Sequence, residues 1–255
     1  LICPPGNAAM PTRIGVPWLP PGAAFPPTSY ALREPDGLLA MGNDLSVTTL
    51  LRAYRRGIFP WFSDGQPPLW WTPDPRLVLA PDRFHLSRSL RKQLRRDRFL
   101  FSIDQAFTRV MRACATPREG QAGTWITDDM LAAYAALHEA GHAHSVEVWQ
   151  DQELVGGFYG VNLGSMFFGE SMFSQRTDAS KAALALFCQL HAAHGITLID
   201  CQMETPHLVS LGARAIRRTD FEALLETRVC TENRWPWPHP PARFSEYAAR
   251  YKLAL

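Results

Sequence analysis

Apolar residues along this chain recur with two periods, one typical of helices and one typical of strands. A helical period of about 3.6 residues appears in residues 86–97, 103–115, 126–141, 178–195 and 219–226. Apolar alternation or short apolar runs between turn residues appear in residues 144–150, 153–161, 165–173 and 196–202. This order of helices and strands predicts an α+β domain with a mixed sheet.

The first 75 residues sustain neither period, because proline and glycine recur too often for long regular elements. One helix is predicted there, with Ser46 as its N-cap and Gly57 at its end. We therefore expect a small irregular α/β domain over residues 1–77 and a larger domain over residues 78–255.

The two ends of the chain are predicted separately from the regular elements. Residues 1–9 lack the basic start and apolar core of a signal peptide and precede Met10, a candidate natural start. They are therefore excluded from the fold prediction. The tail from Trp235 is rich in proline and aromatic residues, and it is expected to wrap the surface.

The composition is that of an ordinary globular protein, with 46% hydrophobic and 20% charged residues and a formal net charge of +2. No apolar run approaches the ~18 residues that a membrane-spanning helix needs, so no membrane association is expected. The five cysteines are scattered without a C-x-x-C pair, which indicates reduced thiols and a cytoplasmic protein. A monomer is the default expectation.

The segment HEAGH, from His138 to His142, matches the H-E-x-x-H pattern of zinc peptidases. In that pattern two histidines one helical turn apart bind zinc, and the glutamate acts as a base. Here Gly141 is a helix-ending residue, so His142 is expected to enter the next strand. A zinc peptidase therefore stays an alternative to the simpler interpretation, two polar rings near a helix C-terminus.

Positive charge is concentrated in residues 83–98, RFHLSRSLRKQLRRDR, which contain seven basic residues and one acid. The candidates for contact with a phosphate backbone are Arg88, Arg91, Lys92, Arg95 and Arg96, with a second cluster at Arg214, Arg217 and Arg218. Such a run is also typical of a solvated helix face. A non-catalytic RNA-binding module that uses this helix alone is the second alternative.

Several polar residues and a glycine pair interrupt the apolar strands. Asp200 and Gln202 lie two apart in LIDCQ, so a regular strand would project both side chains from one face. Buried there, they cost free energy unless they are paired or bind a ligand. Glu170, in FFGESMFS, fits a turn residue, a satisfied core acid or part of a site. The pair at 156–157 indicates a bulge or the close approach of a ligand.

A series of segments gives the chain a resemblance to a known family. They are, in order, EPDGLLAMGNDLS, AYRRGIFPWFS, LWWTPDPR, SRSLRK, GTWIT, HAHSVEVW, LVGGFYGV, FFGESMFS, ASKAAL, LIDCQ and HLVSLGA. Together, from about Phe25 to Phe221, they resemble the leucyl/phenylalanyl-tRNA–protein transferases. The chain departs from the family at Asn43, where a second glycine is usual, and in the tail from Arg234, which has no counterpart.

The resemblance implies an enzyme that transfers Leu, Phe and, less readily, Met from aminoacyl-tRNA to the α-amino group of proteins beginning with Arg or Lys. The added residue would mark those proteins for N-degron proteolysis. The expected partners are thus Leu-tRNA, Phe-tRNA and acceptor proteins, with the basic helix binding the tRNA. The resemblance also implies a catalytic core like that of the acetyltransferase (GNAT) fold, with no metal and no cofactor.

The resemblance carries site residues onto this sequence as well. Asp200 and Gln202 are expected to contact the acceptor amine, and Glu170 to hold the aminoacyl-adenosine. A general-base role for Asp200 is a hypothesis. The aminoacyl side chain is expected in an apolar pocket walled by Trp61, Trp125, Phe158, Phe167, Met172, Leu184, Phe187 and Ile199.

Overall fold

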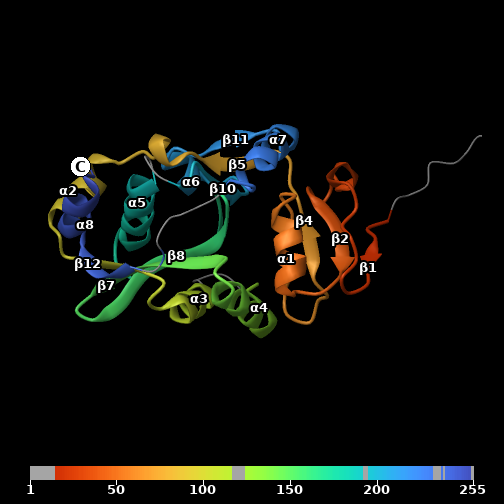
Figure 1. Ribbon diagram of the computed structural model, residues 1–255, viewed down its shortest axis with the longest axis horizontal. Coiled ribbons are helices and arrows are strands. Elements are labelled where there is room, and N and C mark those ends of the chain that lie inside the picture. The colour runs from red at the N-terminus through yellow and green to blue at the C-terminus, as the bar shows by residue number, and fades with distance from the viewer. Residues whose placement is uncertain (1–14, 117–123, 192–194, 232–236, 238, 254–255) are drawn as a thin grey trace, which may run out of the picture.

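The computed structural model describes residues 15–116, 124–191, 195–231, 237 and 239–253, and it contains two β-sheets (Figure 1). The smaller sheet has the order β1-β2-β4-β3 and comprises β1 Trp18–Leu19, β2 Leu38–Gly42, β3 Phe59–Pro60 and β4 Leu69–Trp71. Helix α1 (Val47–Tyr54) lies between this sheet and the rest of the molecule (Figure 1). Its predicted N-cap is confirmed, because the Ser46 side chain accepts a hydrogen bond from the Thr49 N–H.

Asn43 adopts a left-handed backbone conformation, which glycine also adopts readily. Its φ of 65° lies in the left-handed region, which asparagine tolerates better than most residues. Its side chain accepts a hydrogen bond from the Gly22 N–H at 2.9 Å and donates one to the Ala23 carbonyl at 3.1 Å. The departure from the family pattern at Asn43 is therefore a local substitution that also ties two loops together.

The larger sheet is mixed and has the order β11-β5-β10-β9-β8-β7-β6-β12. Its strands are β5 Arg76–Leu79, β6 Leu100–Ile103, β7 Ala143–Gln150, β8 Glu153–Leu163, β9 Met166–Ser174, β10 Leu198–Gln202, β11 Arg214–Ile216 and β12 His239–Arg243. Neighbouring strands are antiparallel except β9 and β10, which are parallel and are connected through helix α5 (Ala179–His191). The predicted α+β class with a mixed sheet is confirmed.

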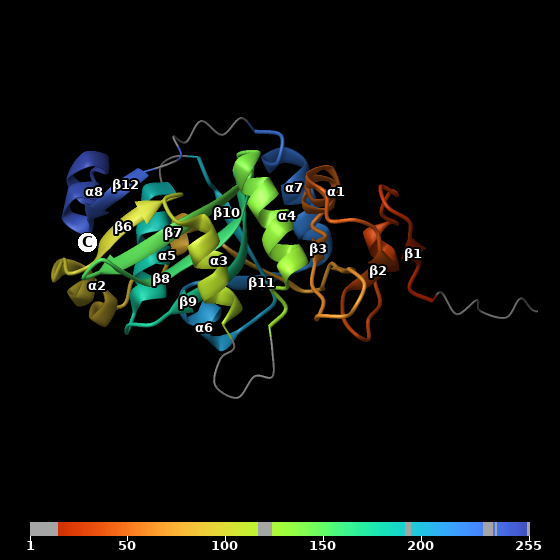
Figure 2. The ribbon, with the colours of Figure 1, turned by 90° about the horizontal axis from the view of Figure 1, so that it is seen from below.

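Helices cover both faces of the larger sheet. Figures 1 and 2 show α5 on one face and α3 (Phe107–Ala115) and α4 (Asp128–Glu139) on the other. The remaining helices are α2 Arg88–Arg95, α6 Pro206–Ser210, α7 Arg218–Arg228 and α8 Phe244–Tyr251, with the short 3-10 helices η1 Thr28–Tyr30 and η2 Pro81–Arg83. Each face buries its own apolar core, and the core under α3 and α4 continues into the N-terminal part.

The helices and strands predicted from the apolar periods are present, and their described bounds agree to within two residues except at one helix start; residues 192–194, in the last turn of the helix predicted over 178–195, lie outside the described residues. The helix predicted from residue 103 begins only at Phe107, because Leu100–Ile103 pairs with β7 as strand β6. The short strands β5, β11 and β12 were not predicted. They are three to five residues long, so they carry too little periodicity to be recognised.

The described part of the tail, which was predicted to wrap the surface, also adds a strand and a helix to the larger sheet. Strand β12 pairs with β6 at the edge of the larger sheet, and α8 follows it. Phe244 and Tyr247 of α8 are almost fully buried. Trp235 and Arg234, from which the tail was predicted to begin, lie outside the described residues, as do residues 1–9 and Met10.

The division into residues 1–77 and 78–255 stays a prediction. Strand β5, which begins at Arg76, belongs to the larger sheet, although it straddles the predicted boundary. No helix in the described part of the chain is both long enough and apolar enough to cross a membrane.

The glycine pair at 156–157 is explained by packing within the protein. A bulge interrupts the pairing of β7 with β8 beside Gly156, as the sequence indicated. A Cβ atom at Gly156 would lie 2.5 Å from the Cβ of Ala179, the first residue of α5. The group that approaches this strand closely is therefore helix α5 and not a ligand.

Replacing Gly156 by alanine should therefore push α5 away from the sheet and reduce the free energy of unfolding by about 1–3 kcal/mol. Denaturant unfolding measures this change. Gly15→Ala is the matched control, because nothing lies within 4 Å of a Cβ at Gly15. Equal stabilities of the two variants would contradict the close approach.

Candidate functional site

The site lies where the two parallel strands of the larger sheet part from each other. Strands β9 and β10 pair only as far as Asp200 and Phe168, although β9 continues to Ser174. Gln202 follows with a φ of 61°, beside a register shift in the pairing with β5. The regular alternation expected for LIDCQ is therefore interrupted, and the side chains of Asp200 and Gln202 take different partners.

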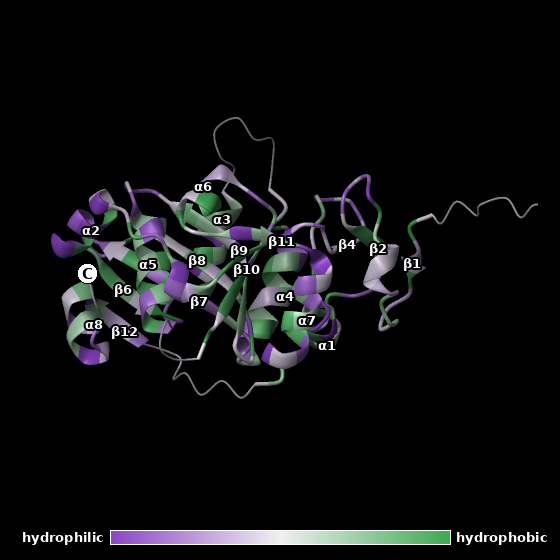
Figure 3. Ribbon diagram, turned by 90° about the horizontal axis from the view of Figure 1, so that it is seen from above, coloured by the Kyte–Doolittle hydropathy of each residue, from purple (hydrophilic) through white to green (hydrophobic). Residues whose placement is uncertain are grey.

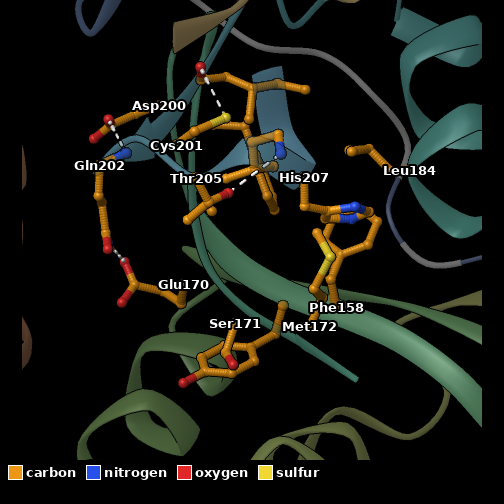
Figure 4. A pocket seen from close by; sticks show the side chains of 15 residues that line it. Phe158, Glu170, Ser171, Met172, Leu184, Asp200, Cys201, Gln202, Thr205 and His207 are labelled. Carbon is orange, nitrogen blue, oxygen red and sulfur yellow. Dashed lines mark hydrogen bonds between the residues drawn. The ribbon is translucent and has the colours of Figure 1, made fainter. Parts of the chain in front are cut away.

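A cavity of about 430 Å³ opens beside the two strands (Figure 4). Five of the eight predicted pocket residues line it, namely Phe158, Phe167, Met172, Leu184 and Ile199. Phe187 lies behind this wall, with its ring centroid 5.4 Å from that of Phe158 and 4.7 Å from that of Phe167. Phe187 was predicted to line the cavity, but it lies one layer behind the wall and supports two of the lining rings.

Trp61 and Trp125 line a second, larger hollow of about 950 Å³ rather than the apolar cavity. Trp71 also lines this hollow, and its ring centroid lies 5.5 Å from that of Trp61 in an edge-on arrangement. Both hollows are lined by Glu170, Ser171, Gln202 and Thr205. Seven of the eight residues predicted to form one pocket therefore line two compartments that meet at Glu170, and Phe187 lines neither.

Glu170 is held by hydrogen bonds from three other elements. Its Oε1 accepts from the Tyr54 hydroxyl of α1 at 2.7 Å and from Nε2 of Gln202 at 3.2 Å. Its Oε2 accepts from the Tyr134 hydroxyl of α4 at 3.0 Å. The hydroxyls of Tyr54 and Tyr134 also contact each other at hydrogen-bond distance.

The three contacts can all be hydrogen bonds when Glu170 carries a proton. Three oxygen–oxygen hydrogen bonds join Tyr54, Tyr134 and Glu170, but two hydroxyls supply only two hydrogens. A protonated carboxyl supplies the third. Burial raises the pKa of Glu170 to about 7, although the bonds from the two tyrosines lower it. Glu170 is thus a carboxyl that gains and loses its proton near neutral pH.

Asp200 is fully buried, and it lies in the wall of the apolar cavity with both carboxylate oxygens hydrogen-bonded within the protein. Its Oδ1 accepts from Nε of Arg76 at 2.8 Å and from the Gln202 N–H at 2.9 Å, and its Oδ2 accepts from a terminal nitrogen of Arg76 at 2.7 Å. The Arg76 guanidinium lies 4.8 Å from the ring centroids of both Phe59 and Phe221. This geometry suits a carboxylate that fixes the backbone of Gln202.

Arg76, Tyr54 and Tyr134 were missed as site residues. Arg76 and Tyr54 lie in the segments LWWTPDPR and AYRRGIFPWFS, so the resemblance contained a signal for them. Tyr134 lies on the buried face of α4 between apolar residues, and nothing in that pattern separates a core tyrosine from one that holds a carboxyl.

The predicted basic helix is present as α2. The side chains of Arg88, Arg91, Lys92, Arg95 and Arg96 are exposed, whereas Leu90 and Leu94 are buried. Figure 3 shows hydrophilic residues gathered on α2. Just before this helix, the His85 N–H donates to the Leu211 carbonyl at 2.9 Å. The start of α2 therefore adjoins the end of α6, which contributes His207 and Leu208 to the cavity.

The second basic cluster does not form a comparable surface. Arg217 makes a bidentate pair with Asp220, with both distances at 2.9 Å. Arg218 donates to the Thr72 carbonyl at 2.9 Å, and its N–H donates to Asp74. The contacts of Arg218 join α7 to the segment before β5, whereas Arg217 and Asp220 form an ion pair on the surface at the start of α7.

The HEAGH segment lacks the geometry of a zinc site. Helix α4 ends at Glu139, and Gly141 has a φ of 77°, so His142 lies beyond the helix as predicted. His138 bonds through Nδ1 to the Ala143 carbonyl at 2.8 Å and stacks on Phe107. Within the described ranges, no group of three or more potential metal ligands gathers.

Two solved structures show a remote likeness to this chain. A GCN5-related N-acetyltransferase from Kribbella flavida is 12% identical with a TM-score of 0.34, covering 66% of this chain and 59% of that one. The L-PGS from Bacillus licheniformis is 11% identical with a TM-score of 0.34, covering 84% of this chain and 64% of that one. Neither similarity is high enough to assign a function.

Sequence relatives are much closer. The model of the family described as "Leucyl/phenylalanyl-tRNA protein transferase" matches residues 78–226, and that of its N-terminal domain matches residues 43–74. The "Leucyl/phenylalanyl-tRNA--protein transferase" of Chromobacterium violaceum is 54% identical over 93% of this chain and 99% of its own length. That of Methylococcus capsulatus is 57% identical over 87% of this chain and 94% of its own length. This chain therefore belongs to the leucyl/phenylalanyl-tRNA–protein transferase family.

Proposed function

We propose that this aminoacyltransferase moves Leu, Phe and, less readily, Met from aminoacyl-tRNA to the α-amino group of proteins that begin with Arg or Lys. The observation that supports this most is the pair of compartments that meet at Glu170. One is an apolar cavity for the donor's side chain, and the other is an aromatic hollow for the reacting ends. Transfer of this kind would take place in the cytoplasm, where the new N-terminus marks the protein for proteolysis.

The apolar cavity selects the donor by desolvation. A charged side chain would lose its hydration against Phe158, Phe167 and Ile199 without gaining a partner, so it is excluded. Leu and Phe are both accepted because an apolar pocket discriminates poorly between guests that differ little in size. Met172 is unbranched and adapts to either shape. The adenosine that carries the ester lies in the second hollow, where Trp61 and Trp125 offer stacking surfaces.

The reaction is the aminolysis of an ester that is already activated. The acceptor's α-amino nitrogen forms a bond to the carbonyl carbon, the ester bond to the ribose oxygen breaks, and the ribose hydroxyl leaves with the proton that the amine gives up. A carboxyl with a pKa of about 7 suits the transfer of that proton between the two sites. Glu170 therefore relays the proton, in addition to holding the aminoacyl-adenosine, and Gln202 helps to orient the acceptor amine.

Asp200 acts in this proposal as a positioning residue and not as the general base. Both of its oxygens already accept hydrogen bonds from the guanidinium of Arg76. Through Oδ1 it also holds the backbone N–H of Gln202, whose side chain reaches Glu170. Its contribution to the acceptor amine is thus indirect.

The direct test of the proposed function is an incubation of labelled Phe-tRNA with an Arg-starting peptide. We expect the label on the peptide's N-terminus, because the apolar cavity accepts Phe and the free amine attacks the ester. The same peptide with an acetylated N-terminus is the control and should take no label. An unlabelled Arg-starting peptide, with the donor still intact, would refute the proposal and favour a non-catalytic RNA-binding module.

The proton relay predicts the pH dependence of transfer. The ionised fraction of Glu170 rises with pH through about 7, so the rate should rise there, in addition to the rise from the acceptor amine itself, whose pKa is roughly 7.7–8.0. The transfer rate of the Glu170→Gln variant should no longer rise near pH 7. It should also be about a hundredfold or more below the wild-type rate. Asp200→Asn should keep that rise. A profile altered by Asp200→Asn but not by Glu170→Gln would assign the base role to Asp200 instead.

The exposed face of α2 should bind the phosphate backbone of tRNA. Replacing Arg91, Lys92 and Arg95 together by glutamine should weaken the use of Phe-tRNA and reduce the slope of log affinity against log salt by about one for each phosphate that the variant no longer neutralises. Transfer from a minimal aminoacyl-adenosine donor, which has no tRNA body, is the internal control and should change little. Equal decreases in transfer with both donors would mean that α2 is structural only.

A further inference from the structure

The aromatic hollow that contains Trp61 has a charge character of its own. Among the described residues that line it there are two carboxylates, Asp64 and Glu170, and no lysine, arginine or histidine. Aromatic rings of Phe59, Trp61, Trp71 and Trp125 form much of the remaining wall. The Asp64 carboxylate and the aromatic faces, with no cation among the described lining residues, favour a positively charged guest over a neutral or negative one.

The carboxylates around the two compartments are not equally able to receive such a guest. Asp200 is committed to Arg76, and Glu170 is committed to two tyrosine hydroxyls and Gln202. Asp64 is exposed, and its carboxylate has no hydrogen-bond or ion-pair partner among the described residues. Of the lining carboxylates that the structure describes, Asp64 alone offers an uncommitted negative charge.

The turn that contains Asp64 is held in place by its own hydrogen bonds. It connects β3 to β4, and the Gln66 N–H donates to the Ser63 carbonyl at 3.1 Å while the Ser63 N–H donates to the Gln66 side chain at 2.9 Å. Gly65, the third residue of the turn, has a φ of 76°, which is the value a type II turn requires. The carboxylate is thus presented by a structured turn at the edge of the hollow.

We propose that Asp64 is a specificity residue that recognises the cationic side chain of the acceptor's first amino acid. This inference rests on the proposed function, since it concerns the acceptor of that same reaction. With the acceptor's α-amine at Glu170 and Gln202, its side chain lies in the part of the aromatic hollow at the β3–β4 turn, beside the adenosine that stacks on Trp61 and Trp125, and the guanidinium or ammonium group meets Asp64 there. An acidic first residue is repelled there, and a neutral one gains no ion pair.

The test compares peptides that differ only in their first residue: Arg, its neutral isostere citrulline, and Glu. With Phe-tRNA as donor, Asp64→Asn should reduce the ratio of kcat/KM for the Arg peptide to that for the citrulline peptide by about three- to tenfold, mainly through the KM of the Arg peptide. The KM for Phe-tRNA should stay unchanged. Asp64→Lys should reduce the ratio further and improve use of the Glu peptide.

Glu226→Gln is the matched control, because this exposed acid on α7 lines neither compartment. An Arg-to-citrulline ratio that is unchanged in Asp64→Asn would overturn the inference. Equal losses for both peptides would also overturn it, since they would show that Asp64 only supports the turn. Wild-type protein that labels no Arg peptide would instead refute the proposed function itself, so the two failures can be told apart.

Discussion

The buried ion pair between Arg76 and Asp200 is the interaction on which the rest of the site depends. Arg76 begins β5 and Asp200 lies on β10, while the rings that cover the guanidinium come from β3 and α7. Removing one partner would leave an uncompensated buried charge, at a cost of about 3–5 kcal/mol. The smaller sheet, the larger sheet and α7 are therefore held together at one point. The Gln202 N–H bonds to the same carboxylate, so the end of β10 is fixed by the same contact.

This constraint extends to the protonation of Glu170. The hydroxyl of Tyr54 reaches Glu170 from α1, which belongs to the N-terminal part, and that of Tyr134 reaches it from α4. The count of hydrogens in this triangle favours a protonated carboxyl, and burial acts in the same direction. A shift of α1 away from the larger sheet would remove the Tyr54 hydroxyl from Glu170 and admit water to the carboxyl. The N-terminal part thus helps to set the proton affinity of a group on the larger sheet.

The sequence could predict the helices, the strands and the kinds of residue in the site, but not how the site residues divide between two compartments. Long helices and strands showed their periods, and Asp200, Gln202 and Glu170 stood out as polar residues among apolar ones. The separation of Trp61 and Trp125 from the apolar cavity was not predictable, because it follows from the divergence of β9 and β10 after Asp200. That divergence depends on tertiary packing and leaves no period in the sequence.

The hydrogen-bond and ion-pair partners of the polar residues could not be predicted from the sequence, for a related reason. A basic residue such as Arg76 is normally exposed, and its burial depends on two rings and a carboxylate that lie far away in the sequence. The positive φ of Gln202 likewise arises from a local irregularity that no alternation pattern contains. Contacts between distant segments decide which polar residue faces which partner. Motif resemblance can mark such positions, but it does not show the pairing.

The two compartments imply two different physical means of selection within one reaction. An apolar cavity discriminates by size and desolvation, which salt hardly affects, and it tolerates guests that differ by a methylene. A carboxylate at the edge of an open hollow discriminates by charge, which salt screens and which lysine and arginine both satisfy. Because the compartments share only Glu170, Ser171, Gln202 and Thr205, the wall of one can change without altering the other. In the proposed reaction, the choice of the donor's side chain and the choice of the acceptor's first residue therefore belong to different walls, and the two compartments meet at Glu170, Ser171, Gln202 and Thr205.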